Sequence, residues 1–385
     1  MTKIYANFNM VFALLASKRS YKFYKLLSNL LQWVSFRIFV GGRRMVISKT
    51  ILAAIVAIIV VIGVGIGVWY WLTMVALTPT PTKPAYKVAV ILPGPINDAS
   101  WNTLGYLTCG EATRKYKIDT AYSEWVSVAD SERVAREYIA DGFNIIIFHG
   151  GQYITPAQKL ADEFPDVIFV IHAGEPIDKP NVWTVVRDDH RYFYFTGYLM
   201  AKLSKSGKIA FLDSQEFPCF VAGVNLMYLA AKEVNPDIKV YYVYVGDWND
   251  PVKAREATEA LIAQGVDVIY AMVNLGFFGV VEAVKEASHH VWIIDNTIAK
   301  PHVDPEHYAT ATEYKVTDLY VNIIGQIIKG KKNGSISIVD YTHLSEEGSC
   351  PKDILKDAHE IEEKVKKGEI ELPQVPFDKY IVPPP

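Results

Sequence analysis

The sequence predicts an α/β protein, with two doubly wound parallel-sheet lobes around a cleft, preceded by a transmembrane helix. Three observations support this fold class. Residues 51–77 form one long apolar run. From residue 86 onward, short apolar runs rich in β-branched residues alternate with segments of helical periodicity, and the alternation starts afresh at Gly207. Uninterrupted apolar strands between helices are typical of parallel sheets covered on both faces.

The apolar run can span a membrane. Apart from Thr73 it carries almost no polar group, and at ~1.5 Å per residue it exceeds a ~30 Å hydrocarbon core. Trp69 and Trp71 lie near its far end, where aromatic rings favour the interface. The run is longer than a secretory signal and lacks a small-x-small cleavage site, which favours an uncleaved signal-anchor over a removed signal.

The charge distribution predicts the orientation. The formal net charge is −3, yet no Asp or Glu precedes Asp98 and nine Lys or Arg lie in the first 50 residues. The remainder therefore carries about −12. The positive-inside rule then places the N-terminus in the cytoplasm and the body outside, in a single-pass protein of the cell membrane with lipid contacts through residues 51–77. An acidic body gives no general attraction for nucleic acid, so no nucleic-acid partner is expected.

Two segments flank the apolar run. Residues 1–50 are expected to be a basic cytoplasmic extension, and Met45 begins a stretch that reads like a complete signal-anchor start. The alternative is a basic amphipathic segment lying on the cytoplasmic leaflet. Residues 78–85 alternate Thr and Pro, which favours a semi-rigid extended linker.

The body is predicted element by element from its periodicity. In the first α/β unit we expect strands at 87–92, 144–148 and 167–171 and helices at 100–116, 130–140 and 156–164. In the second unit we expect strands at 208–212, 239–245, 267–270 and 291–294 and helices at 220–234, 251–264 and 279–287. Pro251 marks a helix start, because proline is favoured in the first turn.

Catalytic and metal-binding motifs are missing from the sequence. It contains no G-x-x-x-x-G-K-[ST] loop, no H-E-x-x-H, no C-x-x-C and no G-x-S-x-G. Asp188 and Asp189 could pair for acid–base chemistry, but a solvated pair that starts a helix is the preferred interpretation. We therefore expect no enzyme, no metal and no cofactor. At most one disulfide can form among three cysteines: Cys109, Cys219 and Cys350.

Several segments resemble one family. Residues 97–102 read Asn-Asp-Ala-Ser-Trp-Asn after the first strand, similar to a family pattern Asp-Asp-x-Ser-Phe-Asn. Further blocks of similar order and spacing lie at 197–199, 235–237, 244–251 and 265–270. On these residues the chain resembles, over about residues 86–330, the basic membrane protein family of ABC-transporter substrate-binding proteins, which includes purine-nucleoside receptors.

The resemblance implies a type I periplasmic-binding-protein fold that closes on a nucleoside by hinge motion. It implies three crossings between the lobes, which we place near Lys205, Thr297 and Gly334. Lobe 1 would then comprise residues 86–205 with 297–333, and lobe 2 residues 206–296 with 334–385.

In lobe 1 the resemblance implies ligand contacts at Asn97, Asp98, Trp101 and Asn102. These residues follow a strand of the predicted sheet, the usual place for polar ligand contacts. Asp and Asn can pair with the edges of a base, and Trp101, in place of the family's Phe, could stack on a purine. The alternative is a helix cap with a packing Trp.

Further along the chain the resemblance implies contacts at Asn274, Phe277 and Asp295, in the expected lobe 2, and at Lys315. Phe277 would complete an aromatic sandwich, Asp295 suits two ribose hydroxyls, and Lys315 could also reach the ribose. The alternatives are a core Phe, a loop cap and an exposed lysine at a helix start.

The resemblance also implies partners: a nucleoside-like ligand, preferably a purine nucleoside, and an ABC permease with separate ATPase subunits. The lipid-attachment Cys of the family is replaced by the apolar run. Two other functions stay open, a membrane-tethered ligand sensor and a receptor for another small solute such as a sugar. A nucleoside-processing enzyme is disfavoured by the missing motifs.

Overall fold

The chain divides into an N-terminal unit and a body, Met1–Thr82 and Lys83–Pro385. The computed structural model describes residues 37–40, 43–46, 48–77 and 86–383. Most of the expected basic extension and the expected linker at 78–85 therefore lie outside the described residues.

In the described part of the N-terminal unit, the long helix α3 (Lys49–Leu77) follows an antiparallel hairpin of β1 (Arg37–Val40) and β2 (Arg43–Val46). Within α3, residues Ala54–Thr73 are long and apolar enough to cross a membrane, and none of them is buried in the structure. This length and composition fit an anchor, and signal sequences share them.

The body contains two six-stranded sheets, which confirms the expected fold class. The first has the order β13-β7-β6-β5-β3-β4, and all its neighbouring pairs are parallel. Its strands are β3 (Lys87–Ile91), β4 (Asp119–Ser123), β5 (Ile145–Phe148), β6 (Ile168–Ala173), β7 (Val182–Val186) and β13 (Gly334–Ser337). The central strands are buried on both faces, as their apolar sequences require.

The second sheet has the order β14-β12-β11-β10-β8-β9, and only β14 runs antiparallel to its neighbour. Its strands are β8 (Lys208–Asp213), β9 (Lys239–Tyr244), β10 (Val268–Met272), β11 (Trp292–Thr297), β12 (Tyr308–Tyr314) and β14 (Thr342–Leu344). Short 3-10 turns lie at Gly151–Tyr153, Pro301–Val303 and Val339–Tyr341.

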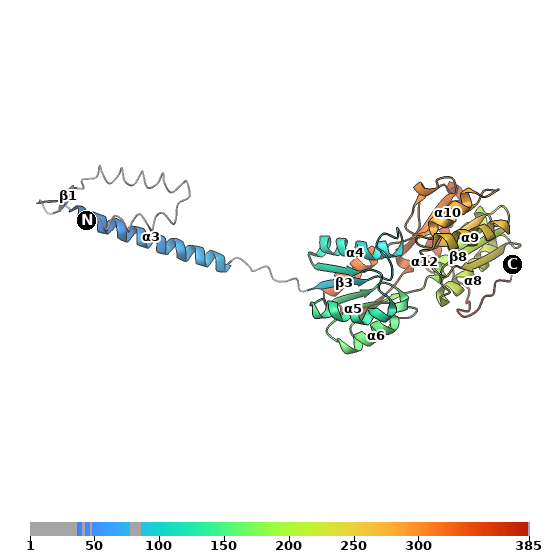
Figure 1. Cartoon of the computed structure of the whole chain (residues 1–385), viewed down its shortest axis with the longest axis horizontal. Helices are drawn as coiled ribbons and strands as arrows, with labels where there is room; N and C mark the ends of the chain where they lie inside the picture. The colour runs from blue at the N-terminus through green and yellow to red at the C-terminus, as the bar shows by residue number, and fades with distance from the viewer. Residues whose placement is uncertain (1–36, 41–42, 47, 78–85, 384–385) are drawn as a thin grey trace. The chain divides into compact units, whose positions relative to one another are not determined.

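Helices lie around each sheet, so the body consists of two α/β lobes (Figure 1). Lobe 1 carries α4 (Trp101–Tyr116), α5 (Val128–Ala140), α6 (Ile154–Glu163) and α11 (Val316–Ile328), which packs on α4. Lobe 2 carries α7 (His190–Leu203), α8 (Pro218–Val234), α9 (Pro251–Ala263), α10 (Phe277–Lys285) and α12 (Lys352–Lys366). Local capping sets several helix starts: Asp250 accepts from two backbone N–H groups of α9, and Pro251 follows it.

The lobe boundaries differ from those expected. β12 lies in the second sheet, although residues 297–333 were assigned to lobe 1, and β13 lies in the first sheet, although residues 334–385 were assigned to lobe 2. α7 packs closely on α8 of lobe 2, although residues 86–205 were assigned to lobe 1, and a Cβ at Gly197 would lie 2.5 Å from the Met227 carbonyl oxygen. Periodicity shows that a segment is a strand or helix, but which sheet it joins depends on non-local pairing.

The chain therefore crosses between the lobes just after β7, between β12 and α11, and between β13 and β14. Hydrogen bonds tie the three crossings together. Tyr314 OH donates to Asp189 Oδ1 at 2.9 Å, Ser337 Oγ donates to Asp188 Oδ2 at 2.7 Å, and Lys315 N donates to the Tyr341 carbonyl oxygen at 2.7 Å. The two aspartates therefore connect the crossing segments, and Asp189 is completely buried rather than solvated.

All three cysteines are free. Cys109 and Cys350 are buried, and Cys219 is half-buried. The body therefore depends on its apolar cores rather than on cross-links.

Candidate functional site

The loop between β3 and α4 holds the predicted lobe 1 residues, and Asp98 organises it. Asp98 is completely buried. Its Oδ1 accepts from the backbone N–H of Ser100 and Thr103 at 2.9 and 3.0 Å, and its Oδ2 accepts from Asn102 N at 2.9 Å. The carboxylate thus caps the first turn of α4, where a negative charge also suits the helix dipole.

Asn102 fixes the same loop from inside the helix. Its Nδ2 donates to Asp98 Oδ2 at 2.7 Å, and its Oδ1 accepts from Gly94 N at 3.1 Å. A Cβ at Gly94 would lie 2.6 Å from Asn102 Nδ2, so glycine is required there. Asn97 is exposed beside this cap. Asp98 and Asn102 shape the loop in this structure, while their contact with a ligand stays a prediction.

Trp101 belongs to a buried aromatic cluster with two histidines. Its ring stacks on His149, with centroids 4.2 Å apart, and meets His172 edge-on at 5.5 Å. Tyr320 OH lies 2.8 Å from His149 Nδ1 and 2.5 Å from His172 Nε2. Burial lowers the pKa of His149 to about 4 and that of His172 well below its usual value, so both rings are neutral at pH 7.

An ion pair at the first crossing borders Trp101. Arg187 Nε lies 2.7 Å from Asp189 Oδ2, and Arg187 NH2 lies 2.9 Å from Asp189 Oδ1. The guanidinium is also 5.2 Å from the centre of the Trp101 ring. With His149 stacked on the Trp101 ring and Arg187 beside it, a purine would stack on Trp101 only after one of them moves.

In lobe 2, Asp295 lies near the end of β11 and pairs with a lysine that the sequence analysis did not select. Lys300 Nζ is 2.8 Å from Asp295 Oδ2, which also accepts from Tyr308 OH at 3.2 Å. Asp295 Oδ1 accepts from Asn296 N at 2.8 Å. Burial raises the pKa of Asp295, and the Lys300 ammonium opposes that shift.

Lys300 joins the two lobes. Its Nζ donates to the Ile298 carbonyl oxygen at 2.9 Å and across the interface to the Ala99 carbonyl oxygen at 3.3 Å. It also lies 4.9 Å from the centre of the Phe277 ring. All three ammonium hydrogens therefore have acceptors, and the side chain is only 7% exposed. Through Lys300 the structure brings Asp295 and Phe277 next to the Asp98–Trp101 loop.

The remaining three predicted ligand residues differ in burial: Phe277, Asn274 and Lys315. Phe277 is completely buried at the start of α10, next to Tyr308. Asn274 is half-buried in the turn before that helix. Lys315 is exposed at the second crossing, 3.7 Å from Glu313, and is not placed with Asp295 by any hydrogen bond or ion pair among the described residues. A ligand role for these three residues stays a prediction.

The sequence signals for the missed residues were weak. His149 and Arg187 directly follow β5 and β7, at the carboxyl edge of the first sheet, where functional side chains gather. Lys300 lies three residues beyond β11. A polar residue just after an apolar strand was the available clue, but it applies to many positions. Among the described residues, no group of three or more His, Cys, Asp or Glu could hold a metal ion.

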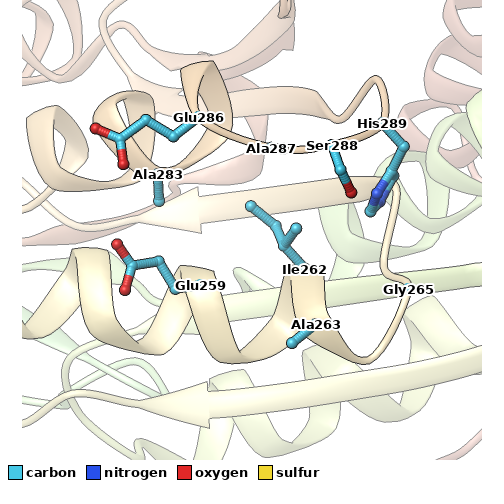
Figure 2. A pocket seen from close by; sticks show the side chains of 9 residues that line it. All are labelled: Glu259, Ile262, Ala263, Gly265, Ala283, Glu286, Ala287, Ser288 and His289. Atoms are coloured by element: carbon cyan, nitrogen blue, oxygen red, sulfur yellow. The ribbon is translucent and has the colours of Figure 1, made fainter.

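A pocket of about 620 Å³ lies elsewhere, between α9 and α10 (Figure 2). Figure 2 shows Glu259 and Glu286 on its two sides. Arg255 lies 2.7 Å from Glu259 and 2.6 Å from Glu286, so these carboxylates are already paired. None of the predicted ligand residues lines this pocket.

The chain matches one protein family and is similar to several known proteins. Residues 85–374 match the family described as ABC transporter substrate-binding protein PnrA-like. A purine-binding protein of Brucella abortus is 29% identical over 74% of this chain and 82% of its own length. The transcriptional activator protein med of Bacillus subtilis is 26% identical over 64% of this chain and 77% of its own length.

A solved structure agrees at the level of the fold. An ABC transporter solute-binding protein from Aeropyrum pernix superposes with a TM-score of 0.65 at 19% identity, over 75% of this chain and 94% of that protein. At this identity the likeness shows the two-lobed architecture.

Proposed function

The chain belongs to the family of PnrA-like ABC transporter substrate-binding proteins, and on this premise we propose that it captures a purine nucleoside between its two lobes for import by an ABC permease. Family membership and the similarity to a purine-binding protein support this ligand class. The observation that carries the proposal is the meeting of the Asp98–Trp101 loop of lobe 1 with Asp295 and Phe277 of lobe 2 around Lys300.

Hinge closure supplies the mechanism. Three crossings tied by Asp188, Asp189 and Lys315 can flex as one unit, while each lobe keeps its sheet. A ligand that contacts both lobes favours the closed form by its differential affinity for that form. Lys300 also favours the closed form, because its bond to the Ala99 carbonyl oxygen forms only when the two lobes are together.

We also propose that α3 keeps the body at the outer face of the cell membrane, with the N-terminus in the cytoplasm. Its unburied apolar stretch, Ala54–Thr73, supports an anchor. N-terminal sequencing of the mature protein from membranes tests this: a terminus upstream of α3 is expected, and one downstream of Leu77 would mean that the segment is removed.

Thermal unfolding of the full chain in detergent tests the ligand. Inosine, guanosine or adenosine is expected to raise the Tm by several degrees, since a ligand at 100 times its Kd stabilises a protein by about 2.7 kcal/mol. Ribose, glucose and amino acids serve as controls on the same preparation. A sugar that raises the Tm when no purine compound does so would contradict the proposal.

A pair of lysine variants tests which cation serves the site. Lys300→Met should weaken nucleoside binding at least tenfold in calorimetry, because it removes the interlobe contact and the counter-charge of Asp295. Lys315→Met should change the affinity less than twofold, since Lys315 is exposed. The reverse order would assign the role to Lys315, as the family resemblance implied. Circular dichroism must show both variants folded.

A ligand sensor is the second candidate, because the chain is also similar to a protein named as a transcriptional activator. The same lobes would then report ligand occupancy to a membrane partner. Uptake of radiolabelled nucleoside by cells that lack the chain separates the two: lost uptake supports import, and unchanged uptake with an altered transcriptional response supports sensing.

A further inference from the structure

Two buried oxygens at one edge of the second sheet have no hydrogen-bond partner in the described part of the chain, Asp213 Oδ2 and Asn249 Oδ1. Asp213 is the last residue of β8 and is completely buried. Asn249 lies in the loop from β9 to α9. Because β8 and β9 are parallel neighbours, Asp213 at the carboxyl end of β8 and the loop that carries Asn249 after β9 belong to the same edge of the sheet. Ligands of open α/β sheets bind at that edge.

The chain orients Asp213 through its other oxygen. Asp213 Oδ1 accepts from Ser214 N at 2.6 Å and from Trp248 Nε1 at 2.8 Å. The Trp248 ring is nearly parallel to Phe217, at an interplanar angle of 17° and a centroid distance of 6.2 Å. The carboxyl group is therefore held by an indole and by the backbone N–H of Ser214, with the backbone N–H of Gln215 also acting on it, while Oδ2 has no partner in hydrogen-bond geometry. An unpaired buried acceptor is costly, and a ligand donor would remove that cost.

Strand pairing places Asp213 near the crossings between the lobes: it lies opposite Met272 of β10, whose Sδ accepts from Tyr192 OH at 3.7 Å, and Tyr192 OH is 2.5 Å from Tyr314 OH at the second crossing. Burial raises the pKa of Asp213 to about 7, and Arg187 acts against this rise. Arg187 is committed to Asp189 and lies beside Trp101, so it gives Asp213 no ion pair of its own. The same Arg187 charge acts on His172 of lobe 1, whose Nδ1 is also buried without a partner.

We infer that Asp213 and Asn249 extend the lobe 2 side of the ligand site beyond Asp295 and Phe277 and accept hydrogen bonds from N–H groups on the edge of a nucleobase. This inference rests on the proposed function and deepens it. The ionised Asp213 carboxylate can only accept, so it selects a ligand edge that carries donors, such as the amino group of adenine or the N1–H of hypoxanthine, and the Asn249 amide can accept beside it or donate to a neighbouring acceptor. The rings of Trp248 and Phe217 beside them suit a planar heterocycle.

Asp213→Asn is the deciding variant. The oxygen of the new amide must still accept from Ser214 N and Trp248 Nε1, so its NH2 group takes the place of Oδ2 and faces the ligand donor. By calorimetry at pH 8 on the full chain in detergent, adenosine or inosine should bind about 10- to 100-fold more weakly. The matched control, Asp237→Asn on the exposed surface of lobe 2, should stay within twofold of the wild type.

Methylated ligands separate base recognition from a structural effect. The wild-type chain should bind N6,N6-dimethyladenosine or 1-methylinosine at least tenfold more weakly than the parent nucleoside, and Asp213→Asn should reduce that difference to less than threefold. The Tm of the free variant should equal or exceed that of the wild type, because an unpaired buried carboxylate is removed.

Three results would be decisive against this assignment. Parent nucleoside affinity that is unchanged in Asp213→Asn overturns it, and so does full discrimination against the methylated ligand in that variant. A lowered Tm with a proportional loss of all binding shows a structural role instead. If the wild-type chain binds no purine compound at all, the proposed function fails, and this inference fails with it.

Discussion

Replacing Asp189 with asparagine is expected to destabilise the body by about 3–5 kcal/mol, the usual cost of removing one partner of a buried ion pair. Asp189 is completely buried and forms a two-bond pair with Arg187. The variant leaves the guanidinium without its counter-charge. It also weakens the bond from Tyr314 OH that ties the first crossing to the second. Urea unfolding of the full chain in detergent, followed by tryptophan fluorescence, measures the loss.

Two further variants test whether the charge pairing of Asp189 with Arg187 is the source of this stability. Asp178→Asn, an exposed change in lobe 1, should stay within about 0.5 kcal/mol of the wild type. Adding Arg187→Met to Asp189→Asn should recover part of the loss, because the unpaired charge is then gone. If the double variant is less stable than Asp189→Asn alone, charge pairing is not the source of the stability.

The second large expected effect is a loss of folding stability at acidic pH that arises from His149. Burial lowers the pKa of His149 to about 4, against an ordinary value of 6.5 in the unfolded chain. The unfolded state therefore binds the proton first, and the stability contributed by the neutral ring is complete above pH 6.5 and is lost as the pH falls to about 4. With ~1.4 kcal/mol for each pKa unit, this amounts to roughly 3 kcal/mol.

The measurement must be a difference between two proteins. The pKa of Asp213 is raised to about 7, so its contribution has the opposite sign and falls as the pH rises from about 4 to 7. The stability of the wild type and of His149→Asn should therefore be compared at pH 7 and pH 4, and the gap should shrink by about 3 kcal/mol at the lower pH. His302→Gln, at an exposed histidine, is the control and should stay within about 0.5 kcal/mol of the wild type at pH 7. A constant gap for His149→Asn would show that the ring is not held neutral by burial.

The sequence predicted most strands and helices because their signals are local. The apolar run from Ile145 to Phe148 is a fully buried strand, as its composition requires. Pro251 begins α9 one residue after its capping aspartate. The apolar helix α3 and the resemblance to the substrate-binding family could also be predicted from the sequence, since both depend on residues close together in the chain.

The candidate site was predicted only in part. Asp98, Trp101, Asp295 and Phe277 were selected, and the structure brings them into one region through Lys300. Lys300 itself was missed, because its acceptor Ala99 lies 201 residues earlier in the chain. No periodicity or spacing signals a contact between such distant residues.

The sequence by itself therefore determined the two α/β lobes, the apolar helix and the ligand class to be tested. The tertiary structure decided that β12 joins lobe 2 and β13 joins lobe 1, that Asp188 and Asp189 connect the crossing segments, and that Asp213 is buried with one oxygen unpaired. The physical reason is how far apart in the sequence the interacting residues lie. Helix and strand formation depend on neighbours within a few residues, whereas sheet membership, ion pairing and burial depend on residues that meet only when the chain has folded.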